Sequence, residues 1–437
     1  MIDEWNEKRD RERQDTIRST NIQSTAARLQ QQPSTSKPSE PKLDTNSSLF
    51  RKKTLPANFQ SKTIGVVINF HLADAAQKYV SSVNTRALDS VINLSKSTWD
   101  HYLNNCQPDY VYDRKMRARE LLHQEIQKLF PEKCINLQVT GSTVNGCGSY
   151  NSDMDMCLCY PTVRYKGQSS DDFYCEQNFS SKILRKIDKA FWRLPPRHSF
   201  KAIIKSCQVI PAKVPIIKLL LAKEFEGIEI DINVNNTAGI YNSHLIHYYS
   251  LSDLRFPALA LMIKHWGLSA GINNSPEGYL NSYTIILLVI HYLQCGVQPA
   301  VLPNLQHLFP SKFDKKLPLE QLLLFGEITE KLPPGPQNPS SLGELIIGFF
   351  YYYCHFDFEN TAISIRSAQV VPRKNLPRDT QNYPMFIEEP FDAINTARSV
   401  RTASHMNVIN SEFRKALKVI SREHFTAAHL GIEVRRR

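Results

Sequence analysis

The sequence has no hydrophobic run long enough to cross a membrane. Its longest apolar stretch, residues 283–293, is shorter than the roughly 18 residues that a membrane-spanning helix requires. The first residues carry charges of both signs and lack the apolar centre of a secretion signal. We therefore expect a soluble, cytoplasmic protein that has no membrane partner.

Cysteine is present but forms no recognisable metal-binding or disulfide pattern. The nine cysteines are an odd number, and no two of them stand in the CxxC spacing of a zinc site. Cys157 and Cys159 lie two residues apart, but no second cysteine pair or histidine cluster accompanies them. This pattern predicts free thiols in a reducing compartment and no structural metal.

The composition is that of a globular protein with a basic bias. Hydrophobic residues make up 42% and charged residues 22% of the 437 residues, which excludes a wholly disordered, collagen-like or coiled-coil chain. Lys and Arg outnumber Asp and Glu by 53 to 42, and the net charge of +11 favours a polyanionic partner such as nucleic acid. The length predicts about two or three domains.

The first part of the chain predicts a leader, a helical segment and a mixed α/β unit. Residues 1–62 are rich in Gln, Ser, Pro and charge, which indicates a disordered leader. We expect residues 63–109 to form a helical segment that packs on the later domain, and residues 110–243 to form a mixed sheet with helices. The expected strands are 136–140, 155–160, 212–219 and 228–234, with a helix at 173–192.

The second part predicts a mainly helical domain over residues 244–437, so the fold class is α+β. Its loops are rich in proline, and no internal repeat is apparent. The expected helices are 258–266, 283–294, 345–353 and 409–420.

A helix predicted before the first strand opens with four basic residues. A solvated face is the favoured interpretation of such a charge run, and an RNA-facing surface is the alternative. The four residues are Arg114, Lys115, Arg117 and Arg119.

An acidic pattern carries the chemistry of the sequence. Gly141-Ser142 is followed, ten residues later, by Asp153 and Asp155 with methionines between and after them. Residues i and i+2 of a strand share a face, so the two carboxylates would lie together and repel. A hard cation such as Mg²⁺, which takes carboxylate and phosphate oxygens, would neutralise them.

A third acid completes this interpretation. In Glu229-Ile230-Asp231-Ile232, alternation places the acids on one face and the isoleucines on the other. Asp231 could thus complete a site for two metal ions about 3.5–4 Å apart. A lone Asp-x-Asp is usually a turn or a solvated strand, but the upstream Gly-Ser and the downstream Ile-Asp-Ile favour a metal site.

These residues resemble the nucleotidyltransferases of the polymerase-beta superfamily, and the resemblance extends from about residue 85 to the C-terminus. The order of the later motifs is similar to that of noncanonical cytoplasmic poly(A) polymerases of the germline-development type. Those motifs are Ala212-Lys213-Val214-Pro215-Ile216-Ile217-Lys218, Ile263-Lys264-His265-Trp266, Gly271-Ile272-Asn273, Leu280-Asn281-Ser282-Tyr283, Val301-Leu302-Pro303-Asn304-Leu305-Gln306 and Glu388-Glu389-Pro390-Phe391-Asp392.

The resemblance implies a role for each matched residue. Asp153, Asp155 and Asp231 would bind Mg²⁺, with Mn²⁺ as an alternative, and Asp231 would help to activate the RNA 3′-hydroxyl. A core or surface role is the alternative for Lys264 and Tyr283. The implied nucleotide-binding residues are Gly141, Ser142, Lys264 and Ser282 for the triphosphate, Tyr283 for the base, and Asn236 or Thr237 for the sugar.

Several positions depart from the family pattern or tempt a different interpretation. Thr140 stands where the family has an apolar residue, Leu268 where many relatives have a second triphosphate-binding basic residue, and Asn281 where Ser is usual. Mg²⁺ prefers oxygen ligands, so the histidines are expected to be packing or surface residues. These histidines are His244, His247 and His265.

The implied reaction is template-independent addition of AMP from ATP to a single-stranded RNA 3′ end. Uridine-adding relatives often carry a His after the Pro-Phe-acid motif, and here residues 393–398 contain none. The alternatives are a terminal uridylyltransferase and a catalytically idle scaffold. A template-directed repair polymerase lacks sequence support. Because no RNA-binding module is recognisable, we expect a separate RNA-binding protein to recruit this chain to its mRNA.

Overall fold

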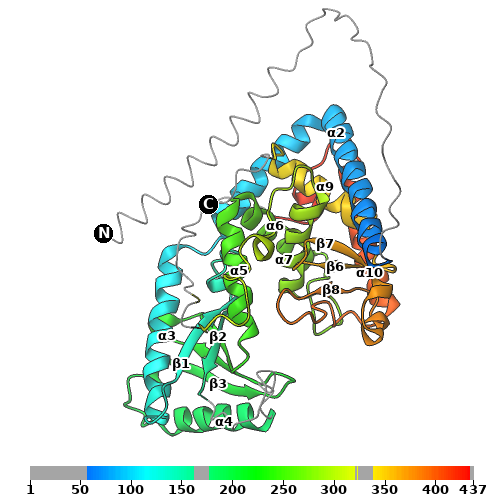
Figure 1. The fold of residues 1–437 in the computed structure, drawn as a ribbon. Coiled ribbons are helices and arrows are strands. Elements are labelled where there is room, and N and C mark those ends of the chain that lie inside the picture. Colours follow the sequence, from blue (N-terminus) through cyan, green and yellow to red (C-terminus); the bar gives the residue numbers. More distant parts are fainter. Residues whose placement is uncertain (1–56, 162–176, 320–321, 323–337, 434–437) are drawn as a thin grey trace, which may run out of the picture.

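The chain forms a unit built on a five-stranded sheet and a second unit made mainly of helices (Figure 1). The structure, a computed structural model, describes residues 57–161, 177–319, 322 and 338–433. Most of the predicted leader and the proline-rich stretch at 333–336 lie outside these residues. Residues 57–62 belong to the first helix rather than to a leader.

The sheet has the strand order β1-β2-β5-β4-β3. Its central strands β2 and β5 are parallel, and the other neighbours are antiparallel. Helices α3 (Asp109–Leu129) and α4 (Gln177–Arg193) share its hydrophobic core. The strands are β1 Asn136–Thr140, β2 Met154–Cys159, β3 Ile204–Ile210, β4 Ile216–Leu221 and β5 Glu229–Val234.

Alternation of side chains explains why the central strands form. In β5, Ile230 and Ile232 are fully buried, whereas Glu229 and Asp231 on the other face are partly exposed. The predictions at 136–140, 155–160 and 228–234 are confirmed to within one residue. The run predicted at 212–219 is β4, which begins at Ile216, and edge strand β3 was not predicted.

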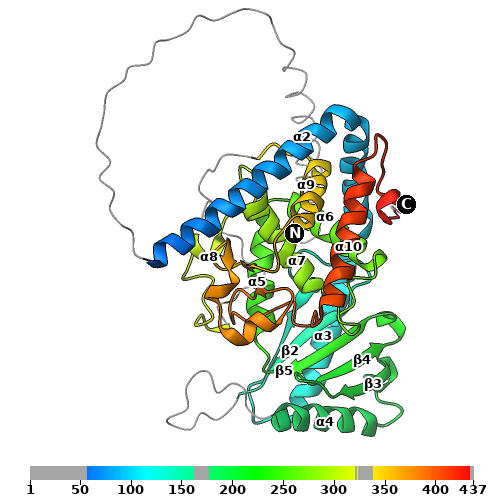
Figure 2. The ribbon, with the colours of Figure 1, turned by 90° about the vertical axis from the view of Figure 1, so that its right-hand side faces the viewer.

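The helical unit surrounds a core rich in aromatic side chains. The long helix α2 (Ala57–Asn105) bends at Ala87 and runs along α9 (Figure 2). Trp266, Phe350 and Phe413 pack against one another at its centre. The remaining helices are α5 Ala238–Ser252, α6 Arg255–Ser269, α7 Ser282–His291, α8 Leu305–Leu308, α9 Leu342–Cys354 and α10 Ala403–Ile420, with a π-helical turn at Tyr292–Gly296.

A three-stranded sheet in this unit was not predicted. Its order is β7-β6-β8, with β6 at Thr361–Ser364, β7 at Gln369–Pro372 and β8 at Ile387–Glu388. Strands of two to four residues are too short to show a periodic pattern. The 3₁₀ turns are Gly141–Thr143, Lys201–Ile203, Lys223–Phe225, Arg373–Asn375, Arg378–Asn382 and Ala428–Leu430.

The chain connects the two units through residues 105–109 and through α5. Helix α5 rises from the sheet into the helical unit and contacts both β1 and α6 (Figure 1). The boundary predicted at residue 243 falls inside this helix. The division of the chain into domains stays a prediction.

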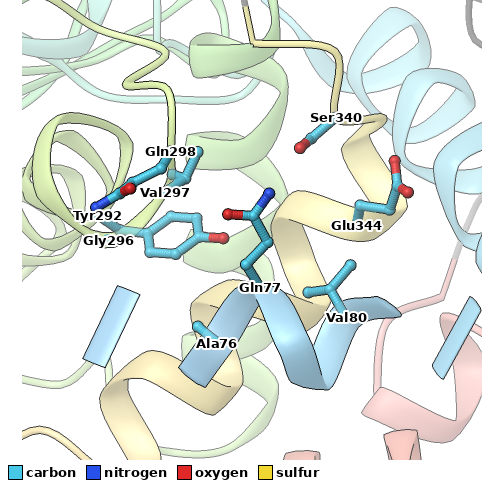
Figure 3. Close-up of a pocket in the computed structure, with 9 residues that line it drawn as sticks. All are labelled: Ala76, Gln77, Val80, Tyr292, Gly296, Val297, Gln298, Ser340 and Glu344. Atoms are coloured by element: carbon cyan, nitrogen blue, oxygen red, sulfur yellow. The ribbon is translucent and has the colours of Figure 1, made fainter. Parts of the chain in front are cut away.

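A small hollow lies between α2, the π-helical turn and the start of α9 (Figure 3). Its volume of about 30 Å³ has room for a water molecule or two and is too small for a nucleotide. Gln77, Tyr292 and Glu344 contribute to its wall. No helix of the described ranges has the length and apolar character that crossing a bilayer would require.

Candidate active site

Three predicted acids come together on the two central strands of the large sheet. Asp155 and Asp231 are register partners on the parallel strands β2 and β5, and Asp153 immediately precedes β2. The methionines that alternate with the first two acids, Met154 and Met156, are fully buried on the opposite face. The prediction that the carboxylates face away from the core is therefore confirmed.

Gly141 lies directly against this acidic face. It has a φ of +70°, and a Cβ atom built on it would stand 2.5 Å from Oδ2 of Asp155. Its backbone N–H donates to Oγ of Ser243 on α5, at 2.7 Å. A phosphate oxygen would therefore have to displace or share this donor, which the sequence expectation for Gly141 did not include.

The electrostatics of the site match a cation-binding centre. The surrounding protein removes part of the hydration of the Asp155 carboxylate, although the side chain remains partly exposed; this raises its pKa from 3.8 to about 6, and the nearby Asp231 and Asp153 carboxylates add to the shift. The pKa values of Asp153 and Asp231 are also raised, first by burial. Lys218 opposes these shifts, but its ammonium is shared with Glu229 at 2.6 Å.

The acids fit divalent metal ions in their chemistry. Oδ1 of Asp231 is buried and has no hydrogen-bond partner, which is costly unless a ligand satisfies it. Carboxylate oxygens are also the ligands that Mg²⁺ prefers. Among the residues that the structure describes, no three His, Cys, Asp or Glu side chains already form a closed metal cage. Metal binding would therefore require these carboxylates to draw together.

Stability should depend jointly on pH and on magnesium. An acid whose pKa is raised by folding destabilises the folded state once it ionises, so metal-free stability should fall as pH rises from about 4 to about 6. Magnesium should therefore raise the thermal unfolding midpoint more at about pH 8 than at about pH 5. Equal increases in the unfolding midpoint at both pH values would contradict this prediction. Asp155→Asn should diminish both the pH dependence of metal-free stability and the stabilisation by magnesium.

Lys264 reaches toward the acidic face from helix α6. Its Nζ atom donates to the backbone oxygen of Cys147 at 3.5 Å, and Asp155 acts on it electrostatically. Burial lowers the pKa of Lys264. A cation in this place could bind triphosphate, as the sequence predicted. Leu268, one helical turn later, is 60% exposed and offers no second phosphate ligand.

Ser282 and Tyr283 stand at the start of helix α7. The Ser282 hydroxyl lies 3.2 Å from Nδ2 of Asn273, and the hydroxyl of Tyr283 donates to Oε1 of Glu389 at 3.4 Å. Asn281, the departure from the family pattern, accepts from the N–H of Thr284 and so caps the helix. The substitution therefore preserves the local structure that presents Ser282 and Tyr283.

Glu389 contacts Tyr283, and Asn242 contacts Glu389; the sequence interpretation quoted Glu389 in a motif without giving it a role and did not single out Asn242. Glu389 is 3% exposed and accepts from the backbone N–H groups of Phe391 and Asp392. Asn242 on α5 bonds to Glu389, and its own Oδ1 is buried without a partner. Helix α5 contains several other polar residues, such as Ser243 and His244, so its sequence gave no signal that singles out Asn242.

Asn236 and Thr237 lie at the far end of β5 from the acids. Asn236 is exposed, and its N–H donates to Oδ1 of Asn233. Thr237 precedes α5. Their role toward the sugar stays a prediction.

The histidines pack as expected. His244 is 5% exposed and contacts Tyr248 edge to face, and burial lowers its pKa to about 4. His265 stacks near His101 of α2, with ring nitrogens 3.3 Å apart. Their surroundings are those of interior side chains.

The basic run on α3 only partly follows the expectation of a solvated face. Arg117 is exposed, but Lys115 is 2% exposed and lies behind the acidic site. Burial lowers the pKa of Lys115 to about 8, while Asp153 and Asp155 favour its charged form. The expectation was wrong for Lys115 because it considered only the charges on the helix. The loop at residues 143–152, which is distant in sequence, covers this side chain.

Comparison with known families matches both units. Residues 94–251 match the family described as "Poly(A) RNA polymerase, mitochondrial-like, central palm domain". Residues 341–395 match the "Cid1 family poly A polymerase". The two matches contain the acidic triad and the Glu389 loop, respectively.

Relatives that match about two thirds of this chain are also named poly(A) RNA polymerases. Poly(A) RNA polymerase GLD2-B of Xenopus laevis is 36% identical over 305 residues, which are 69% of this chain and 55% of the relative. Human GLD2 is 35% identical over 69% of this chain and 59% of its own length. Caenorhabditis elegans gld-2 is 33% identical over 68% of this chain. This chain spans only 25% of that worm relative.

Solved structures share the fold. A GLD-2/RNP-8 complex contains a chain that is 31% identical, with a TM-score of 0.66, over 78% of this chain and 99% of that one. The Cid1 poly(U) polymerase with bound MgGTP is 25% identical, with a TM-score of 0.60, over 77% of this chain and 96% of that one. The α+β, polymerase-beta-like fold class is thereby confirmed.

Proposed function

Since this chain belongs to the GLD2-type poly(A) RNA polymerases, a noncanonical family with the polymerase-beta-like nucleotidyltransferase fold, we propose that it is a polynucleotide adenylyltransferase. It would add AMP from ATP to the 3′ end of single-stranded RNA without a template. The observation that carries this proposal is the pairing of Asp155 with Asp231, beside Asp153, on adjacent parallel strands.

The reaction is an in-line exchange at the α-phosphorus of ATP. The RNA 3′-oxygen forms a bond to that phosphorus while the bond to the pyrophosphate oxygen breaks, and pyrophosphate leaves. The 3′-hydroxyl proton needs an acceptor, and the carboxylate of Asp231 on β5 would supply one. Lys264 and Ser282 would hold the triphosphate while this occurs.

Divalent ions are the cofactors of this proposal. Asp153, Asp155 and Asp231 would hold Mg²⁺ or Mn²⁺, which when bound would lower the pKa of the attacking hydroxyl and neutralise phosphate charge. Lys218 and Lys264 place further positive charge near the carboxylates. Through these ions, the three acids would orient the nucleotide and the RNA 3′ end.

The polar groups beside Tyr283 support adenine as the added base. The Glu389 carboxylate and the unpaired Oδ1 of Asn242 are hydrogen-bond acceptors near the Tyr283 hydroxyl. Adenine carries an amino group that can donate to such acceptors, whereas uracil carries a carbonyl oxygen at the equivalent ring position. Residues 393–398 are the segment in which uridine-adding relatives often carry a His. Here Asn395 of that segment is bound within the protein: its Nδ2 donates to the backbone oxygen of Met385, and its Oδ1 accepts from the backbone N–H of Ile387.

A four-nucleotide assay tests the reaction and the base together. Purified chain, a labelled single-stranded RNA and Mg²⁺ should give extension with ATP at least about 10-fold faster than with UTP. Preference for UTP would support the uridylyltransferase alternative. No extension with any nucleotide, by protein that unfolds cooperatively, would support the idle scaffold.

A partner protein belongs to the same proposal. Solved structures show GLD-2 in complexes with RNP-8 and with GLD-3. We infer that a separate RNA-binding protein recruits and stimulates this chain on mRNA by raising the local concentration of 3′ ends. Full, processive tailing by the isolated chain at low RNA concentration would argue against recruitment.

We infer that the chain works in the cytoplasm, in a reducing environment. The cysteines that the structure describes form no disulfide with one another, as is usual in the cytosol. Microscopy of a fluorescent fusion would refute this inference if the signal were confined to another compartment.

A further inference from the structure

We propose that Lys115 is a positioning residue of the active site, and that its ammonium group fixes the loop that joins Ser142 to Asp153. This inference rests on the proposed function, because it concerns how that site is held ready for a metal–nucleotide complex. No motif of the site contains Lys115, which lies on α3 and reaches the loop from behind.

The contacts of Lys115 join both ends of the loop. Its Nζ atom donates to the backbone oxygen of Ser152 at 2.7 Å and lies 3.2 Å from the Ser152 hydroxyl. It also lies 3.3 Å from Oγ1 of Thr143. Thr143 directly follows Ser142, and Ser152 directly precedes Asp153. One cation therefore sets the spacing between a proposed phosphate ligand and a proposed metal ligand.

Gln107 forms the second part of the same clamp. Its Oε1 accepts from Lys115 at 2.9 Å, and its Nε2 donates to the backbone oxygen of Thr143 at 3.0 Å. Gln107 stands in the short connection between α2 and α3. Its backbone N–H donates to the oxygen of Gly148, and Tyr150 donates to that of Asn105. The loop is thus bound to the segment that joins the two units.

The charge of Lys115 distinguishes this clamp from ordinary packing. A buried cation is costly unless opposite charge or strong hydrogen bonds compensate it. Its hydrogen-bond partners are all neutral, and the negative charges that act on it are Asp153 and Asp155. The ammonium therefore also reduces repulsion between these carboxylates before metal and nucleotide bind.

The test compares nucleotide affinity in four full-length variants. Calorimetry would measure the Kd of a non-hydrolysable ATP analogue with Mg²⁺, and primer extension would measure KM for MgATP and for RNA. Lys115→Met preserves the length of the side chain but removes its charge. It should weaken analogue binding about 10-fold and raise the KM for MgATP by a similar factor. The KM for RNA should stay within about twofold of the parental value. Gln107→Ala should weaken binding about threefold.

The double variant tests whether the two residues form one device. Because both act on the same loop, Lys115→Met with Gln107→Ala should bind the analogue no more than about twofold worse than Lys115→Met alone. Lys128→Met, a change on an exposed part of the same helix, is the matched control and should bind like the parent.

Some results would overturn the inference. A Lys115→Met protein with parental Kd and both KM values unchanged, whether or not turnover falls, would show that Lys115 is merely structural. If Lys115→Met fails to unfold cooperatively, an unchanged Kd in Gln107→Ala would overturn it instead. A parent that binds the analogue but extends no RNA would refute the proposed function while the Kd values still judge Lys115. A parent that binds no analogue would overturn both.

Discussion

Replacing Asp155 by alanine should lower RNA extension by on the order of 10³-fold or more while leaving the protein folded. The loss should be this large because Asp155 is the register partner of Asp231 and both other acids act on it electrostatically, so its removal breaks the proposed metal site. Removal of an ionised carboxylate with a raised pKa also relieves repulsion, so metal-free protein near neutral pH should keep or increase its thermal unfolding midpoint.

The control for this prediction is Glu224→Ala, which removes an exposed acid of the same unit. It should extend RNA at the parental rate. Extension assays and thermal unfolding of both variants, with and without Mg²⁺, provide the comparison. If Asp155→Ala extended RNA within about 10-fold of the parent, the triad would not be the catalytic centre.

Gly141→Ala should lower extension by about 100-fold or more. The new methyl group would stand 2.5 Å from Oδ2 of Asp155, so the carboxylate would have to leave its position. The left-handed backbone at this residue would add about 1 kcal/mol of strain, which should appear as a small fall in the free energy of unfolding. Activity should therefore suffer far more than stability.

Gly227→Ala is a matched control for the backbone effect. Gly227 has a φ of +83°, but a Cβ atom there would meet no atom within 4 Å. Its replacement should cost about 1 kcal/mol of stability and leave extension unchanged. Extension rates and denaturant unfolding would measure both effects. Equal activity in the two variants would contradict the close approach of Gly141 to Asp155.

The acidic site was accessible from sequence because its information is local. A strand with alternating acids and buried methionines or isoleucines fixes which face each side chain takes. Asp155 and Asp231 therefore followed from two short patterns. Their register across β2 and β5 could not be read from either strand alone, and it came from the fold.

Other parts of the fold lacked such a local signal. Strand β3 is an edge strand on which Lys205, Ser206 and Gln208 are exposed, so its apolar alternation is weak. Helix α5 is buried on nearly all sides, as Ile240, Tyr241, Leu245 and Ile246 illustrate, and shows no single apolar stripe. Periodicity identifies elements with one buried face and fails for those with none or several.

Lys115 and Asn242 show the same limit at the site. Each is a polar residue whose role depends on segments distant in sequence: the 143–152 loop for Lys115, and Glu389 for Asn242. Residue type alone predicted a surface lysine in the first case and gave no prediction in the second. Only tertiary contacts distinguish them from similar residues nearby.

The parallel pairing of β2 with β5 has a consequence for how the protein folds. Two parallel neighbours need a long crossover, and here about 75 residues, including α4, β3 and β4, separate Asp155 from Asp231. Contacts that close so long a loop form slowly. The catalytic centre should therefore be completed late during refolding, and the appearance of magnesium-dependent nucleotide affinity would mark the arrival of the native state.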